Sequence, residues 1–117
     1  MIGPKAYIHL NRLEQNICNI QRNIGERNLM VVVKANGYGH GAVNIANFLS
    51  KNSAIIFCVF TIDEAMKLRE NGIKNSILIF SRINKEWINL AIKYNLWVNA
   101  CHIDDLRLLD SFQSENS

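Results

Sequence analysis

One short stretch, residues 31–41, combines residue types that could carry chemistry. It reads Val-Val-Val-Lys-Ala-Asn-Gly-Tyr-Gly-His-Gly. Lys34 is the first polar residue after three valines, so we expect it at the carboxyl end of a buried parallel strand, where α/β folds place their active sites. A dry sheet edge disfavours the charged form of an amine, and a neutral amine can form a Schiff base with an aldehyde.

The residues that follow Lys34 favour an anion beside that amine. Gly37, Gly39 and Gly41 allow a tight turn with positive φ angles. The turn leads into a predicted helix, whose first free N–H groups attract an anion, and the Tyr38 hydroxyl could point toward the same anion. An aldehyde-reactive lysine beside a phosphate-binding turn is the chemical outline of a pyridoxal phosphate site.

The residues alone leave two other interpretations of this stretch open. A lysine at a strand end can simply be a solvated terminus. Gly37-x-Gly39-x-x-Ala42 also matches the dinucleotide-binding fingerprint, with Asp63 about twenty residues further on. In that fingerprint the first glycine normally follows the strand directly, whereas three residues intervene here, and Asp63 falls at the start of a predicted helix. The dinucleotide match is therefore weak.

The elements that must position Lys34 alternate along the chain. Strands are expected at residues 6–10, 29–33, 55–60, 77–80 and 96–98, and helices at about 11–24, 41–51, 61–71, 85–94 and 103–112, before a polar end at 114–117. Asn11 with Glu14 and Thr61 with Glu64 predict capping boxes. The continuous apolar runs at 29–33 and 55–60 indicate parallel strands covered on both faces.

Strand–helix units that recur roughly every 20 to 25 residues predict an α/β fold with a parallel sheet. A doubly wound sheet and part of a (β/α)8 barrel both fit this pattern. Four or five units fill an open sheet but make only about half of a barrel, which needs eight. Composition does not choose between the two.

The bulk composition excludes several classes of protein. With 49% apolar and 20% charged residues, the 117-residue chain is globular, either one domain or part of one. A diffuse net charge of +3 gives no reason to expect nucleic acid or an anionic membrane as a partner. Three cysteines without a C-x-x-C pair predict neither a metal site nor disulfides. With no signal peptide and no long apolar run, a cytoplasmic, soluble protein is expected.

The string from Val32 to Gly41 resembles the pyridoxal phosphate attachment motif of alanine racemases almost letter for letter. Asn16 is similar to an asparagine in the first helix of that family. Further similar segments are Asp63-Glu64-Ala65, Leu68-Arg69, Gly72-Ile73 and Ile77-Leu78-Ile79. The resemblance is clear from about Tyr7 to Phe80 and thin after that.

The resemblance implies that residues 1–117 form the N-terminal half of a pyridoxal-phosphate-binding (β/α)8 TIM-type barrel of fold-type III. The family continues with a β-domain and works as a homodimer. Lys34 would hold pyridoxal 5'-phosphate and act as one of two acid–base groups, Tyr38 would bind the cofactor phosphate, and Val32 would line its pocket. The implied reaction interconverts L-alanine and D-alanine, which supplies D-alanine for peptidoglycan. His40 is expected to brace the loop rather than to transfer protons.

The resemblance also implies parts that this sequence does not contain, namely a second phosphate loop, an arginine for the pyridine nitrogen and a tyrosine for the opposite face of the substrate. We therefore expect the chain alone to be inactive, as a fragment, a truncated product or a half-barrel completed by another chain. A non-catalytic cofactor-binding barrel and an inactive remnant are the alternative functions. Phe80-Ser81 stands where the family usually has Leu-Gly, and the bulk of Phe80 is expected to alter the cofactor pocket.

Overall fold

Four parallel strands form one curved sheet in the computed structural model, which describes residues 7–34, 37 and 41–116, with the backbone alone for 113–116. The strands are β1 (Leu29–Val32), β2 (Ile55–Val59), β3 (Ile77–Arg82) and β4 (Trp97–Asn99), and they pair in the order β1-β2-β3-β4. Each strand therefore adds to the same side of the preceding one.

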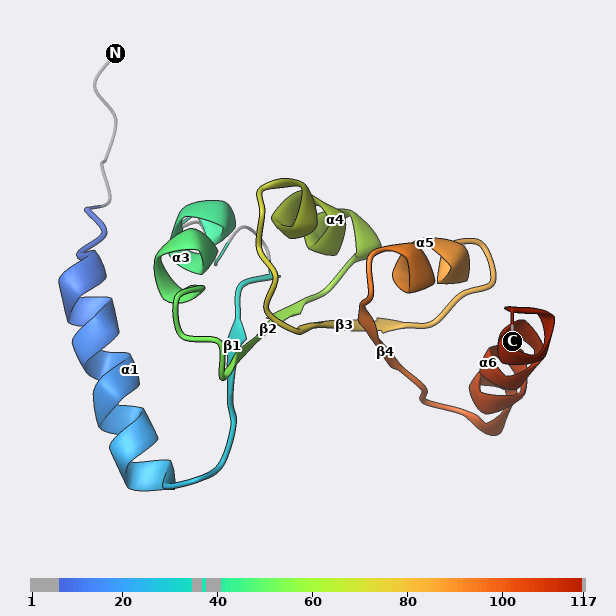
Figure 1. Cartoon of the computed structure of the whole chain (residues 1–117), viewed down its shortest axis with the longest axis horizontal. Helices are drawn as coiled ribbons and strands as arrows, with labels where there is room; N and C mark the ends of the chain where they lie inside the picture. Colours follow the sequence, from blue (N-terminus) through green and yellow to red (C-terminus); the bar gives the residue numbers. More distant parts are fainter. Residues whose placement is uncertain (1–6, 35–36, 38–40, 117) are drawn as a thin grey trace, which may run out of the picture.

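This strand order decides between the two expected architectures. In a doubly wound sheet the direction of strand addition reverses, and helices cover both faces. Here α3 (Ala42–Leu49), α4 (Ile62–Glu70) and α5 (Ile88–Lys93) all lie on the convex side of the sheet, and α1 (Leu10–Ile24) and α6 (Ile103–Asn116) flank its two ends (Figure 1). The chain therefore has the architecture of part of a (β/α)8 barrel, as predicted, and the doubly wound interpretation is wrong.

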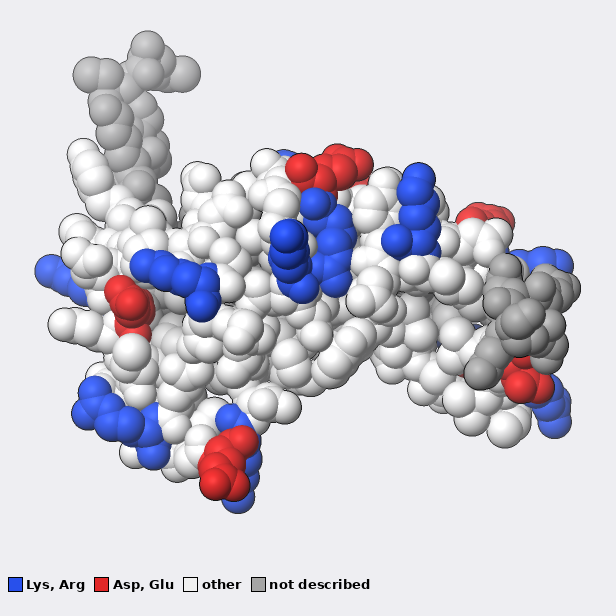
Figure 2. All heavy atoms as spheres, in the orientation of Figure 1, with Lys and Arg blue, Asp and Glu red and all other residues white. Residues whose placement is uncertain are grey.

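The molecule is an open arc, and its concave side is hollowed (Figure 2). Its radius of gyration is 16.3 Å, whereas a compact domain of this length has about 13 Å. In the view of Figure 2 the charged side chains are scattered, and they form no continuous field of one sign. None of the helices in the described part of the chain is long and apolar enough to cross a membrane.

The core lies between the sheet and the helices on its convex side. Strand side chains that alternate along the chain face these helices, namely Leu29, Val31, Val33, Ile55, Phe57, Val59, Ile77 and Ile79. All of β2 is buried, as predicted for residues 55–59, but Phe60 is half exposed. The prediction that β1 is covered on both faces is wrong, because Met30 and Val32 are exposed on the concave side, where no described element covers them.

The N-terminal predictions need two corrections. Residues 7–9 form no strand, and Leu10 already belongs to α1. Leu10, Leu13 and Ile17 recur at helical spacing, so Leu10, the last residue of the expected strand, becomes the first residue of the helix. The N-cap of α1 is accordingly His9, without a side-chain cap, so the predicted Asn11 capping box does not form. The end of α1 at Gly25, with φ of +67°, is confirmed.

The later elements follow the predicted order with shifted bounds. The capping box of α4 is confirmed, since the Glu64 backbone N–H donates to Thr61 Oγ1 at 3.2 Å and Glu64 Oε1 accepts from the Thr61 backbone N–H at 3.0 Å. By contrast, α5 is shorter than predicted, and β3 runs two residues further, to Arg82. The expected polar end at 114–116 is helical, because α6 continues to Asn116.

Candidate functional site

Lys34 lies at the carboxyl edge of the sheet, where the sequence places it. The Val33 backbone N–H donates to the Cys58 carbonyl at 2.8 Å, so the pairing of β1 with β2 continues to the residue before Lys34. Val33 is buried in the core, and Lys34 is partly buried. Within the described part of the chain, the Lys34 amine has neither a hydrogen bond nor an ion pair. The amine is therefore available to a ligand at this edge.

A glycine-dependent turn follows the lysine. The Gly37 backbone N–H donates to the Val33 carbonyl at 2.8 Å, and Gly37 has a φ of +66°. A Cβ atom at this position would lie 3.3 Å from Ile45 Cδ1 and 3.4 Å from the Ala42 backbone nitrogen. The backbone therefore turns tightly against α3, and only glycine combines this φ angle with this close approach.

The beginning of α3 provides an environment that suits an anion. Its N-cap is Gly41, with φ of +88° and no side chain that could cap the helix, and the first turn contains no acidic residue. Because α3 connects the carboxyl end of β1 to the amino end of β2, this N-terminus opens at the same edge of the sheet as Lys34. The positive end of the helix dipole favours negative charge there.

The other residues predicted for the site fall into two groups. Tyr38, Gly39 and His40 lie outside the described residues. Val32 lies on the concave side of β1, two residues before Lys34, and is 36% exposed. Asp63 is exposed in the first turn of α4 rather than at the end of β2, which is not where a dinucleotide site needs its ribose-binding acid.

An apolar floor lies beneath the carboxyl edge on the concave side. The strand register places Val32, Cys58, Leu78 and Trp97 in one row across the sheet. Cys58 is fully buried, and this burial raises the pKa of its thiol. Phe80, two residues beyond Leu78, is partly buried. A planar, largely apolar ligand could rest on the accessible residues of this row, which are Val32, Leu78 and Trp97.

A second polar group at this edge was missed by the sequence reasoning. Arg82, the last residue of β3, pairs with Asp105 of α6, and its Nε donates to the two carboxylate oxygens at 2.9 and 3.1 Å. Asp105 Oδ2 also accepts from the backbone N–H groups of Cys101 and His102, at 2.8 and 3.1 Å. The only local signal was an acidic first turn in the last helix, and nothing local links that turn to Arg82.

The electrostatics of this pair favour its charged form. Desolvation of the Asp105 carboxyl acts to raise its pKa, but the hydrogen bond and charge of Arg82 and the two backbone donors outweigh it, and the pKa is lowered. The hydrogen bond from Arg82 to Asp105 in turn raises the pKa of the guanidinium.

Nowhere in the described ranges do three or more His, Cys, Asp or Glu residues gather in a way that could hold a metal ion.

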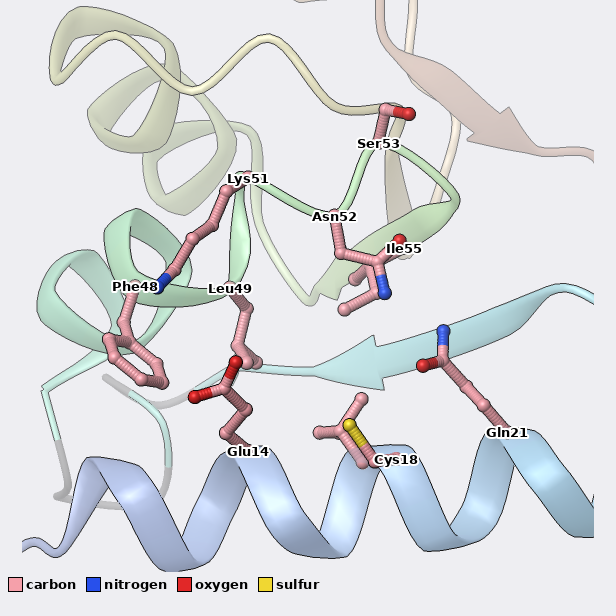
Figure 3. A pocket seen from close by; sticks show the side chains of 10 residues that line it. Glu14, Cys18, Gln21, Phe48, Leu49, Lys51, Asn52, Ser53 and Ile55 are labelled. Atoms are coloured by element: carbon pink, nitrogen blue, oxygen red, sulfur yellow. The ribbon is translucent and has the colours of Figure 1, made fainter.

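A separate groove of about 430 Å³ lies between α1 and α3 (Figure 3). Figure 3 shows the side chains of Glu14, Cys18 and Gln21 rising from α1 toward Leu49 and Ile55. Because Ile55 begins β2, the groove opens at the amino edge of the sheet, away from Lys34. It therefore does not belong to the site at the carboxyl edge.

Comparison with known proteins identifies the family. The family described as "Alanine racemase, N-terminal domain" matches residues 8–117. The chain belongs to this alanine racemase family. Among curated relatives, the alanine racemase of Halalkalibacterium halodurans is 39% identical over 99 residues, which cover 83% of this chain and 26% of the relative. The alanine racemase of Streptococcus mutans is 39% identical over 112 residues, which cover 95% of this chain and 29% of the relative.

Solved alanine racemases share the fold of this chain. The enzyme of Clostridium difficile superposes with a TM-score of 0.81 at 28% identity, over 91% of this chain and 29% of the other. The enzyme of E. faecalis superposes with a TM-score of 0.77 at 38% identity, over 86% of this chain and 27% of the other. The chain thus spans less than a third of the length of the alanine racemases it matches.

Proposed function

We propose that the protein carrying this chain interconverts L-alanine and D-alanine, with pyridoxal phosphate held on Lys34. The observation that carries the proposal is the position of a partly buried lysine at the carboxyl edge of the sheet, directly before a glycine-dependent turn. Membership of the alanine racemase family supports the reaction. In this proposal the enzyme is a cytoplasmic homodimer that supplies D-alanine for peptidoglycan.

The residues at this edge fit the cofactor. The apolar floor with Val32 suits an aromatic ring, and the positive end of the α3 dipole suits a phosphate group. Tyr38 is proposed to donate a hydrogen bond to that phosphate. When bound, pyridoxal phosphate withdraws electrons from the α-carbon of an amino acid, which makes the α-proton removable. Lys34 Nζ is proposed to take this proton, or return it, on one face of the substrate.

Racemisation needs a second acid–base group on the opposite face, because a proton removed and returned on one face regenerates the same enantiomer. The resemblance assigns that group to a tyrosine in the C-terminal domain of a partner subunit, in a part of the family that this chain does not match. We therefore expect the 117-residue chain by itself to leave L-alanine unchanged in a chiral assay over hours.

The experiment that tests the proposal compares Lys34→Arg with Lys51→Arg in the full-length protein. Both variants keep a positive charge, and Lys51 lies at the amino-edge groove. Loss of an essential acid–base group typically costs about 10²–10⁴-fold in rate. We expect Lys34→Arg to lower the racemisation rate by at least about 10²-fold and Lys51→Arg to leave it unchanged. Normal turnover by Lys34→Arg contradicts the proposal, and cofactor binding without turnover in the unmodified protein favours a non-catalytic cofactor carrier.

A further inference from the structure

Phe60 presents a firmly held aromatic side chain at the carboxyl edge of the sheet. Its backbone N–H donates to Glu64 Oε1 at 3.0 Å, and its carbonyl accepts from the Ser81 backbone N–H at 3.0 Å. Both polar backbone groups of Phe60 are therefore bonded, although the residue lies just beyond the end of β2. The side chain is nevertheless 51% exposed. The described residues thus fix the place of this ring and leave about half of it free for contacts at the edge.

Phe60 is the neighbour of Lys34 across the sheet. The Val33 backbone N–H donates to the Cys58 carbonyl at 2.8 Å, so the ladder between β1 and β2 ends with Val33 beside Val59. Lys34 and Phe60 are the next residues of the two segments. Neighbouring strands lie about 5 Å apart in a sheet. The methylene stem of a lysine spans that spacing, so the stem of Lys34 can lie along the ring of Phe60.

The other neighbours of Lys34 and Phe60 make this pairing one-sided. The register of β2 and β3 pairs Val59 with Ile79, and its continuation places Phe60 beside Phe80, which is partly buried. Aromatic side chains at neighbouring positions support each other. On its other side, β1 has no pairing strand in the part of the chain that the structure describes. Among the described strands, only β2 therefore brings a side chain next to Lys34.

A lysine that moves a proton must bring its amine to the same place in each turnover. The Lys34 amine has neither a hydrogen bond nor an ion pair within the described residues, so no polar contact among them orients it. Lysine stems pack along apolar surfaces while the amine stays free. A misplacement of about 1 Å in a reacting group can cost on the order of 10²-fold in rate. A fixed ring beside the stem is therefore a means of orienting the amine.

We propose that Phe60 packs against the methylene stem of Lys34 and orients its amine. Phe60 is then a positioning residue, which acts through Lys34 and not on the substrate. The proposal rests on the proposed function, because it assumes that Lys34 moves the α-proton. It also gives the capping box of α4 a part in the site, since Glu64 holds the backbone of Phe60.

The first test observes the contact by NMR in the full-length protein without cofactor, with lysine isotopically labelled at Cε. Protons over the face of an aromatic ring are shifted upfield by its ring current. The Lys34 signal is the one that is missing from Lys34→Arg. We expect Phe60→Leu, which keeps an apolar side chain but has no ring, to move the Lys34 signal downfield. An unmoved signal would overturn the proposal.

Met30→Ala is the matched control for both tests. Met30 lies on the same face of the sheet as Phe60 and is 47% exposed, but it stands four residues before Lys34 on β1. We expect Met30→Ala to leave the Lys34 signal in place. A shift as large as that of Phe60→Leu would contradict a specific contact with Phe60.

The second test measures racemisation by the full-length, cofactor-loaded protein. Phe60→Ala should lower kcat by about tenfold or more and change KM less, because the ring orients the amine and does not bind the substrate. Phe60→Leu should recover most of this loss, since it restores an apolar surface for the stem. A kcat of Phe60→Ala equal to that of Met30→Ala would contradict the proposal. If the unmodified protein fails to racemise alanine, the proposed function fails, whereas the NMR signal still decides whether Phe60 packs on Lys34.

Discussion

At the scale of single residues, the position of Lys34 depends on the turn that follows it. Three valines bring the chain to the carboxyl edge, and this could be predicted from their types alone. The contact between Gly37 and Ile45 of α3 could not be predicted, because it depends on how the turn packs. The pairing of Arg82 with Asp105 was likewise invisible in the sequence, since it joins two residues 23 positions apart.

Gly37→Ala tests whether the turn is packed as tightly as the structure shows. A non-glycine residue with positive φ costs roughly 1–2 kcal/mol, and the new Cβ would in addition press on Ile45 at 3.3 Å. Gly72→Ala is the matched control, because Gly72 has φ of +86° with nothing within 4 Å of the added Cβ. Urea unfolding should show the larger loss of free energy of unfolding for Gly37→Ala. Equal losses would contradict the described packing.

The buried thiol of Cys58 gives a prediction that depends on pH. Burial raises its pKa above the ordinary value of 9.0, whereas Cys18 and Cys101 are exposed. Because the folded pKa is raised, the contribution of Cys58 to stability is present below pH 9.0 and is lost as the pH rises through the folded pKa. At pH 8, iodoacetamide should modify Cys18 and Cys101 and spare Cys58 until urea is added. Rapid labelling of Cys58 in the folded chain would show that the sheet is not packed as described.

At the scale of elements, features that depend on neighbouring residues could be predicted from the sequence, whereas features that depend on contacts between distant segments could not. The capping box of α4 is encoded within four residues, and the structure confirms it. The same pattern at Asn11 failed, because α1 begins at Leu10 and Asn11 therefore lies inside the helix, two residues after the N-cap His9. The order of the strands depends on contacts between distant segments, so the sequence pattern left two architectures open. At the amino edge of the sheet, a single arginine, Arg69, also joins segments that are distant in sequence.

Arg69 of α4 joins the segments that precede β3 and β4. Its guanidinium donates to the carbonyls of Tyr94, Ile73, Asn75 and Asn95, at distances from 2.7 to 3.1 Å. Arg69→Lys leaves one amine for four acceptors, and we expect the free energy of unfolding to fall by about 2 kcal/mol. Arg107→Lys, at an exposed ion pair, should change it by less than about 0.5 kcal/mol. Denaturant titration of both variants measures these changes. Equal losses of free energy of unfolding would contradict this role of Arg69.

At the scale of the whole molecule, the arc leaves several apolar side chains exposed on one face of its sheet, although Ile56 and Cys58 on that face are buried. Met30, Val32, Phe60 and Trp97 are exposed there by 36–51% of their surface. Apolar faces of this kind mark surfaces that are covered by further protein or that associate. In the full-length relatives, which are more than three times as long as the matched region, further chain is available to cover such a face.

The 117-residue chain expressed alone should therefore associate with itself and bind the dye ANS, since its concave face would meet water. Phe60→Ser should reduce both effects, because Phe60 lies on that face. Tyr7→Ser, which also removes an exposed aromatic side chain but lies outside the sheet, should leave both unchanged. Sedimentation velocity and ANS fluorescence measure the two effects. A monomeric chain that leaves ANS dark would contradict an open apolar face.

The most direct measurement of the central claim is to locate the bound cofactor chemically. The full-length protein is mixed with pyridoxal phosphate, treated with sodium borohydride so that the cofactor is fixed to the lysine that holds it, and digested for peptide mapping by mass spectrometry. We predict that the cofactor mass is found on the peptide that contains Lys34. A label on any other lysine, or an unchanged label in Lys34→Arg, would contradict the account.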